Sequence, residues 1–233
     1  MKRILLTFIT LIISLSVYAQ FGFQSHVVTN EKKTTDGPVS VFSVDLDNDG
    51  DLDILSALYD DDNIVWYRNE DGLGNFGFQQ LLINTVPFEK PSYAFPSDID
   101  GDGDMDVVAV NDQISNSDID SVVWFENLDG NGTFGPKQII SINVSSPRSV
   151  FADDIDGDGD TDVISASLVD GKVAWYRNLD GNGNFSDQIV VVSVASAKHV
   201  ILADLDGDND KDIVFTKDSN FGKVSWLENL DGL

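Results

Sequence analysis

The sequence predicts an all-β fold, a β-propeller of four-stranded antiparallel blades. Four aspartate-rich strings of nine residues recur, and their starts lie 53, 56 and 50 residues apart. Short runs of β-branched and aromatic residues separate them, together with Asp-Gly pairs that suit tight hairpins. A four-stranded repeat of about fifty residues is typical of propeller blades.

Four segments of the first repeat, rich in β-branched and aromatic residues, are expected to form its four strands. They comprise residues 41–44, 54–58, 64–67 and 78–83. The third strand is apolar on both faces, which fits a sheet covered on both sides by neighbouring blades. Every tryptophan of the chain occupies this strand, and we expect them to pack between blades rather than to form a sugar-stacking platform. They are Trp66, Trp124, Trp175 and Trp226.

The repeats are expected to extend over residues 37–85, 90–143, 146–193 and 197–233, within a domain of residues 20–233. Residues 21–30 match the fourth strand of the first repeat, so we expect them to complete a last blade. One interpretation is a closed ring of four blades. The favoured one is part of a larger ring, because propellers have about four to eight blades and the last hairpin motif is incomplete.

The N-terminus has the pattern of an export signal. Two basic residues precede an apolar run over residues 4–17, and small residues stand at Val17 and Ala19. This pattern predicts a signal peptide of residues 1–19. The run is shorter than the roughly 20 residues that cross a bilayer, so a secreted or cell-surface protein without membrane insertion is expected.

The composition of the chain excludes several classes of site and partner. The chain has no cysteine, which excludes disulfides, thiolate metal sites and cysteine catalysis. It has 14 basic and 40 acidic residues, and its net charge of −26 repels nucleic acid. A cation is the natural counter-charge.

The aspartate strings predict calcium sites, because Ca²⁺ takes six to eight oxygen ligands within a small radius. We number the nine positions of each string and name its aspartates by position, so the ninth aspartate is the one at position 9. The aspartates at positions 1, 3, 5 and 9 are expected to supply side-chain oxygens, and the aspartate at position 7 a backbone carbonyl. An EF-hand is excluded, since no glutamate stands at position twelve. The predicted side-chain ligands are Asp45, Asp47, Asp49, Asp53, Asp98, Asp100, Asp102, Asp106, Asp154, Asp156, Asp158, Asp162, Asp204, Asp206, Asp208 and Asp212, and the carbonyl donors are Asp51, Asp104, Asp160 and Asp210.

The fourth string has Asn209 in place of the turn glycine, which asparagine can replace because it tolerates a positive φ. Up to four Ca²⁺ ions are therefore expected. The hairpins at Asp129 and Asp180 resemble further metal loops but are expected to be plain turns.

The strings and their framing strands resemble the FG-GAP or VCBS-type repeat, the unit of propellers similar to the N-terminal domain of integrin α subunits. The resemblance covers roughly residues 37–233 and implies calcium in the loops of a propeller. The chain departs from integrin-like propellers in having four repeats, and its second repeat carries extra residues around 113–120.

The favoured function is a secreted, non-catalytic, calcium-stabilised module for adhesion to an extracellular protein or glycan. The alternatives are a lectin and the propeller scaffold of a calcium-dependent polysaccharide-degrading enzyme. No catalytic residue is predicted, because neither histidine belongs to a zinc or triad pattern. The residues five positions before each string vary between repeats and are candidates for ligand contact. These are Ser40, Tyr93, Ser149 and His199.

Overall fold

The computed structural model describes residues 24–28, 37–82, 88–112, 119–218, 222–230 and 232. These residues form fifteen strands in four antiparallel sheets and contain no helix. In every sheet, strands that are consecutive in the chain are neighbours, as hairpin connections require. We call the sheets blades 1 to 4.

The blades have the following strands. Blade 1 contains β1 (Pro38–Val44), β2 (Asp53–Leu58), β3 (Asn63–Tyr67) and β4 (Gln80–Leu81), and blade 2 contains β5 (Pro91–Ser97), β6 (Asp106–Asn111), β7 (Ser121–Phe125) and β8 (Gln138–Ser141). Blade 3 contains β9 (Pro147–Asp153), β10 (Asp162–Ser167), β11 (Lys172–Tyr176) and β12 (Ile189–Ser193), and blade 4 contains β13 (Ala197–Ala203), β14 (Asp212–Lys217) and β15 (Lys223–Leu227).

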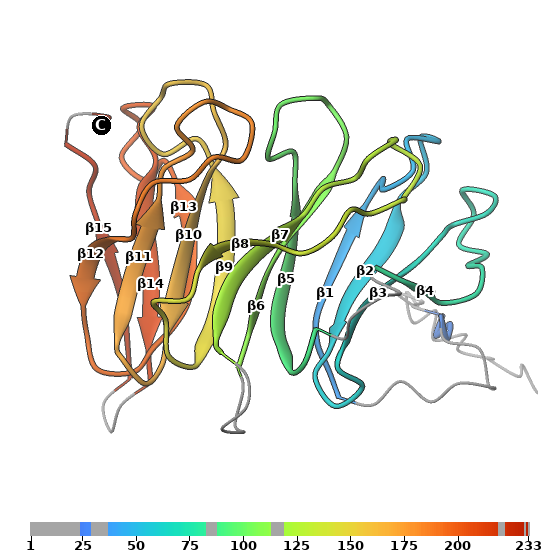
Figure 1. Ribbon diagram of the computed structural model, residues 1–233, viewed down its shortest axis with the longest axis horizontal. Helices are drawn as coiled ribbons and strands as arrows, with labels where there is room; N and C mark the ends of the chain where they lie inside the picture. Colours follow the sequence, from blue (N-terminus) through green and yellow to red (C-terminus); the bar gives the residue numbers. More distant parts are fainter. Residues whose placement is uncertain are drawn as a thin grey trace, which may run out of the picture.

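The blades stand side by side in chain order, from β1–β4 on the right to β13–β15 on the left of Figure 1. The first strands of successive blades, β1, β5, β9 and β13, contact one another in sequence. The predicted fold class is therefore confirmed, as a row of antiparallel propeller-type blades.

Three apolar cores hold the row together, one at each junction between successive blades. In the first, Trp66 of blade 1 packs with Val107 and Phe125 of blade 2. Trp124 and Trp175 occupy the same position at the second and third junctions. Trp66 and Trp124 are 2% and 3% exposed. The prediction that these tryptophans pack between blades is confirmed for the first three.

Several predicted boundaries change. The fourth strand of blade 1, expected over residues 78–83, forms at Gln80–Leu81 alone. The predicted signal peptide and residues 113–118 of the insertion lie outside the described residues.

Residues 24–28 are the described part of the segment that was predicted to complete a last blade, and they form no strand. Val28 packs against Leu58, Val65 and Tyr67 of blade 1, whose apolar side chains attract it. The completion of a last blade by this segment stays a prediction.

Candidate metal centres

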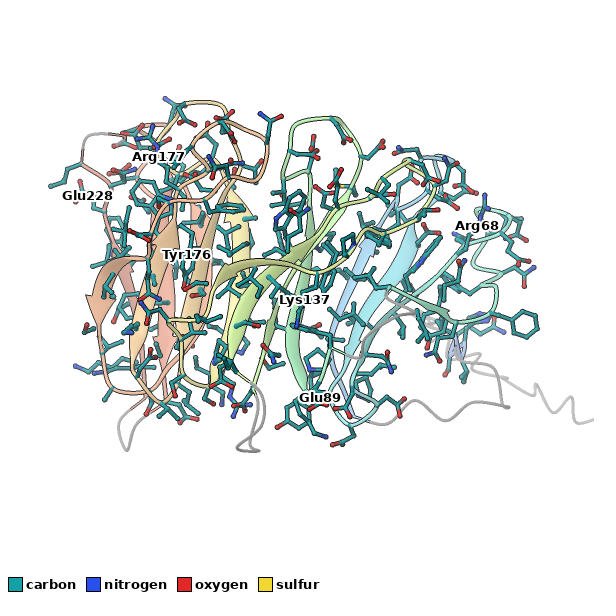
Figure 2. All side chains as sticks on the ribbon, viewed as in Figure 1. Arg68, Glu89, Lys137, Tyr176, Arg177 and Glu228 are labelled. Atoms are coloured by element: carbon teal, nitrogen blue, oxygen red, sulfur yellow. The ribbon has the colours of Figure 1, made fainter. Side chains whose placement is uncertain are left out.

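The four aspartate strings connect the first and second strands of their blades. We call them loops 1 to 4, comprising residues 45–53, 98–106, 154–162 and 204–212. They lie along one edge of the row, at the top of Figure 2, and Arg68 and Arg177 lie at the same edge. The antiparallel meander produces this arrangement, because every blade turns from its first to its second strand at the same end.

Each loop brings three carboxylates together. In loops 1 to 3 these are the first, third and ninth aspartates, and in loop 4 the first, third and fifth. One oxygen from each residue of a group lies within 4.8 Å of the others. The groups are Asp45, Asp47 and Asp53; Asp98, Asp100 and Asp106; Asp154, Asp156 and Asp162; and Asp204, Asp206 and Asp208.

The first aspartate of each loop fixes the backbone turn. Asp98 accepts hydrogen bonds from the N–H groups of Gly101 and Gly103, at 2.8 and 3.1 Å. The residue at the sixth position has a positive φ, which favours glycine. In loop 4, Asn209 adopts a φ of 78°, as expected, and donates its backbone N–H to Asp204.

The third residue of loops 1 and 3 is a buried aspartate. Asp47 and Asp156 are 6% and 7% exposed, and the Oδ1 atom of each has no hydrogen-bond partner among the described residues. Burial raises the pKa of both carboxyl groups. A buried carboxylate oxygen without a donor is costly, and a coordinated cation would satisfy it.

The ninth aspartate joins its loop to the third strand of the same blade. Asp106 is fully buried and accepts the N–H groups of Ile99 and Asn127, at 3.0 and 2.7 Å. Burial raises the pKa of Asp106 to about 7, because desolvation outweighs these two donors. The same cause raises the pKa of Asp162 to about 6. A cation in the loop would favour the charged form of both groups.

The fifth aspartates of loops 1 and 3 bind arginine, a contact that the sequence analysis missed. Arg68 donates Nη2 to Asp49 at 2.9 Å, and Arg177 donates Nη2 to Asp158 at the same distance. These hydrogen bonds lower the pKa of Asp49 and Asp158. The sequence does carry a signal for this contact. Each third strand is followed by a charged residue and then an asparagine, and the charged residue is arginine in repeats 1 and 3 and glutamate in repeats 2 and 4.

The seventh aspartates turn their side chains away from the loop centres, toward the hairpins of the blades. Asp51, Asp104 and Asp160 lie against the backbone of Gly72, Gly130 and Gly181, where a Cβ would overlap them. The backbone carbonyl of the seventh residue stays its predicted contribution to the loop.

The donor set fits a hard divalent cation. Each loop offers several carboxylate oxygens, which are the ligands that Ca²⁺ and Mg²⁺ prefer, and no sulfur or imidazole takes part among the described residues. Without a cation the carboxylates of a loop repel one another by up to about 4 kcal/mol per pair at 4 Å and an effective dielectric of 20.

The family profile of the FG-GAP-like repeat matches residues 45–109, 98–165 and 154–215. Each matched segment runs from one loop to the second strand of the following blade. The chain belongs to the FG-GAP-like repeat family.

Two solved structures are similar to this FG-GAP-like chain to different degrees. The biofilm matrix protein Bap1 of V. cholerae is 20% identical with a TM-score of 0.43, and the match covers 82% of this chain and 26% of Bap1. BBS1N, solved in complex with ARL6DN, is 11% identical with a TM-score of 0.51, and the match covers 83% of this chain and 55% of BBS1N. The second likeness supports the fold. No curated protein matches the chain.

The residues five positions before each loop, which differ between the FG-GAP-like repeats, lie in different environments. Tyr93 lies in β5 and His199 in β13, which are the first strands of their blades, and their ring centroids are 6.1 Å apart. Ser149 is 1% exposed and accepts the N–H of Val200 in the next blade, so it cannot meet a ligand. Ser40 is half-buried.

The hairpins at Asp129 and Asp180 are turns, as expected. Asp129 Oδ1 accepts the N–H groups of Asn131 and Thr133, and Asp180 Oδ1 accepts that of Asn182. The carboxylates are therefore used by their own backbone. In the described part of the chain, no helix is long and apolar enough to cross a membrane.

Proposed function

We propose that this chain is an exported, non-catalytic repeat module in which calcium binds loops 1 to 4 and stiffens the row of blades. The observation that carries the proposal is the buried third aspartate of loops 1 and 3, whose Oδ1 atom faces a carboxylate cluster without a hydrogen-bond donor. Repeats of the FG-GAP-like family are generally non-catalytic, which supports a binding role.

A structural role for calcium follows from the magnitude of its effect. If each loop binds with a Kd near 0.1 mM, about 1 mM calcium contributes roughly 1.4 kcal/mol per loop. Four loops contribute about 6 kcal/mol, which is comparable with the stability of an ordinary domain of about 5–15 kcal/mol.

Calcium titration with thermal melting of the mature chain tests this proposal. We expect up to four bound ions and a melting temperature about 12–24 °C higher in 1 mM calcium than in chelator, because about 6 kcal/mol shifts it by about 2–4 °C per kcal/mol. Asp47→Asn should lower the stoichiometry by one ion. Equal melting temperatures in calcium and chelator would refute the structural role.

The partner that we propose is an extracellular protein or glycan, bound at the face where the first strands of the blades, such as β5 and β13, come together. Tyr93 and His199 support this face, because they are the two aromatic candidates that lie together there. Binding to a glycan array or to matrix proteins, lost in Tyr93→Ala and kept in a substitution at the exposed Leu73, would support it.

A further inference from the structure

The residue that directly follows the third strand of each blade differs in charge between repeats. It is Arg68 in blade 1, Glu126 in blade 2, Arg177 in blade 3 and Glu228 in blade 4. Because the third strand ends beside the loop of its own blade, this residue brings either a positive or a negative charge to an otherwise similar carboxylate cluster.

The arginines enter their clusters in the same way. Arg68 Nε lies 2.7 Å from Asp47 Oδ2, and its Nη2 lies 2.9 Å from Asp49 Oδ2. Arg177 repeats this with Asp156 and Asp158, at 2.6 and 2.9 Å. Each guanidinium thus bridges the third and fifth aspartates, two of the four predicted side-chain ligands.

Glu126 brings the opposite charge to loop 2. It precedes Asn127, whose backbone N–H binds Asp106 of this loop at 2.7 Å. The described residues provide no ion pair between a basic side chain and an aspartate of loop 2. This cluster therefore has an additional negative charge where loops 1 and 3 have a positive one.

We infer that the chain has two classes of cation site, in which Arg68 and Arg177 are tethered cations that weaken divalent binding in loops 1 and 3, while loop 2 binds most tightly. The inference rests on the proposed function. Loop 4 carries Glu228, but its clustered aspartates Asp204, Asp206 and Asp208 are exposed, so solvent screens their charges and gives this loop an intermediate affinity.

The size of the effect follows from Coulomb repulsion. A calcium ion bound to Asp47 and Asp49 would lie about 5 Å from the guanidinium, and a single positive charge at that distance lowers affinity at least about tenfold even in water. The arginine also gives the loop a counter-charge when no divalent ion is bound. Loops 1 and 3 should consequently remain ordered even when the calcium concentration is too low to fill loop 2.

Calorimetric titration of the mature chain with calcium tests the inference. Arg68→Gln should raise the affinity of one site at least about tenfold, and Glu126→Arg should lower that of another by a similar factor. Lys198→Gln is the matched control, because it removes one positive charge from an exposed pair with Asp218, away from the loops. In chelator, Arg68→Gln should lower the melting temperature more than Lys198→Gln.

The outcomes separate the two proposals. If no variant and no wild-type protein binds calcium, the proposed function fails. If the wild type binds four ions with one affinity, or if Arg68→Gln leaves all affinities unchanged, the two-class inference alone is overturned.

The first and last blades of the row each present an apolar sheet face. Blade 4 exposes the sheet face that blades 1 to 3 bury: Trp226 is 45% exposed and Val224 is 75% exposed, whereas Trp66 and Trp124 are 2% and 3% exposed. The described residues include no blade that covers this face.

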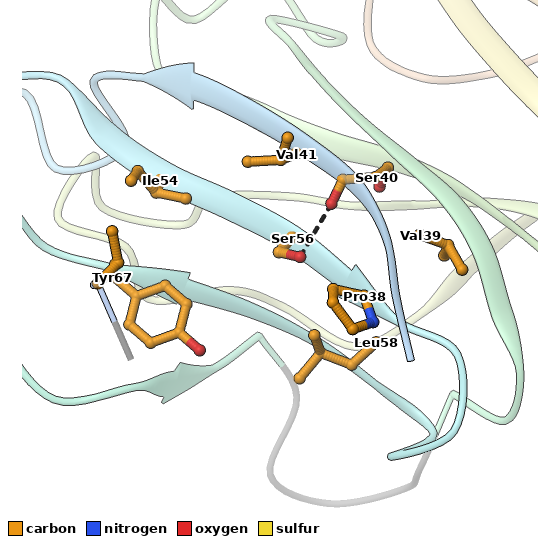
Figure 3. A pocket seen from close by; sticks show the side chains of 9 residues that line it. Pro38, Val39, Ser40, Val41, Ile54, Ser56, Leu58 and Tyr67 are labelled. Atoms are coloured by element: carbon orange, nitrogen blue, oxygen red, sulfur yellow. Dashed lines mark hydrogen bonds between the residues drawn. The ribbon is translucent and has the colours of Figure 1, made fainter. Parts of the chain in front are cut away.

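Blade 1 exposes the opposite sheet face. Val41 is 68% exposed, whereas its counterparts Ala94, Val150 and Val200 are 0%, 0% and 1% exposed. A groove of about 490 Å³ lies over this face, lined by Val41, Ile54 and Tyr67 and, at one side, by Val28 of the N-terminal segment. Figure 3 shows it, with Ser56 Oγ donating to Ser40 O at 2.9 Å across its floor.

Each internal junction joins a tryptophan face to the face equivalent to that of Val41. The exposed faces of blades 4 and 1 are therefore of the two kinds that the junctions within the row bring together.

Discussion

Gly132 provides a direct test of how successive blades lock together. It lies in the hairpin of blade 2 with a φ of 77°, and a Cβ at this position would overlap the Trp66 ring of blade 1. Gly74 occupies the same hairpin position in blade 1, with a φ of 87° and no atom within 4 Å of a built Cβ. Alanine therefore strains the backbone at both sites but meets a neighbouring side chain at Gly132 alone.

The magnitudes follow from these two terms. Alanine at a positive φ costs roughly 1–2 kcal/mol in either variant. The overlap with a packed tryptophan adds about 1–3 kcal/mol in Gly132→Ala. At about 2–4 °C per kcal/mol, its melting temperature should lie roughly 3–10 °C below that of Gly74→Ala.

Urea unfolding in saturating calcium, followed by tryptophan fluorescence, measures both costs. Gly183→Ala is an internal replicate, because its Cβ would overlap Trp124 in the same way. Equal destabilisation by Gly74→Ala and Gly132→Ala would show that the hairpin does not rest on Trp66, and the packing argument would be wrong.

Two further contacts between blades lead to predictions. Asn127 donates Nδ2 to the carbonyl of Leu46 in blade 1 at 2.9 Å, whereas Asn69 donates to a carbonyl of its own blade. Asn127→Ala should cost about 1–3 kcal/mol and Asn69→Ala less, as thermal melts can check. Arg148 of blade 3 lies 2.6 Å from Asp112, which follows β6 of blade 2 and is 5% exposed. Arg148→Ala should cost about 2 kcal/mol, since Arg148 is partly exposed, and Asp112→Asn added to it should restore part of the loss.

The fold was predictable because the same local pattern occurs four times. Alternating apolar residues and fixed turn positions determine which segments form strands, and repetition shows that the pattern is not accidental. The length of the fourth strand was less predictable. Residues 78–83 have strand-like composition, yet β4 forms only at Gln80–Leu81. An outer strand pairs on one side only, so fewer neighbours fix its extent.

The candidate site was predictable in part for a similar reason. Alternation brings the first and third aspartates of a loop together, and their spacing is visible in the sequence. The role of Arg68 was not predictable from the loop, because 19 residues separate it from Asp49 and the two meet only after the third strand returns beside the loop. The fully buried ninth aspartate also serves the backbone, a use that composition does not reveal.

The hydrogen bonds of the loops indicate why a cation at one edge would stabilise the whole row. Leu46 lies between two predicted ligands of loop 1, and its carbonyl accepts Asn127 of blade 2. Ile99 of loop 2 accepts Asn178 of blade 3 in the same way, at 2.9 Å. Fixing the backbone of a loop therefore fixes the acceptor that holds the next blade. We expect calcium to strengthen the junctions between blades as well as the loops, so that its removal lowers the cooperativity of unfolding together with the melting temperature.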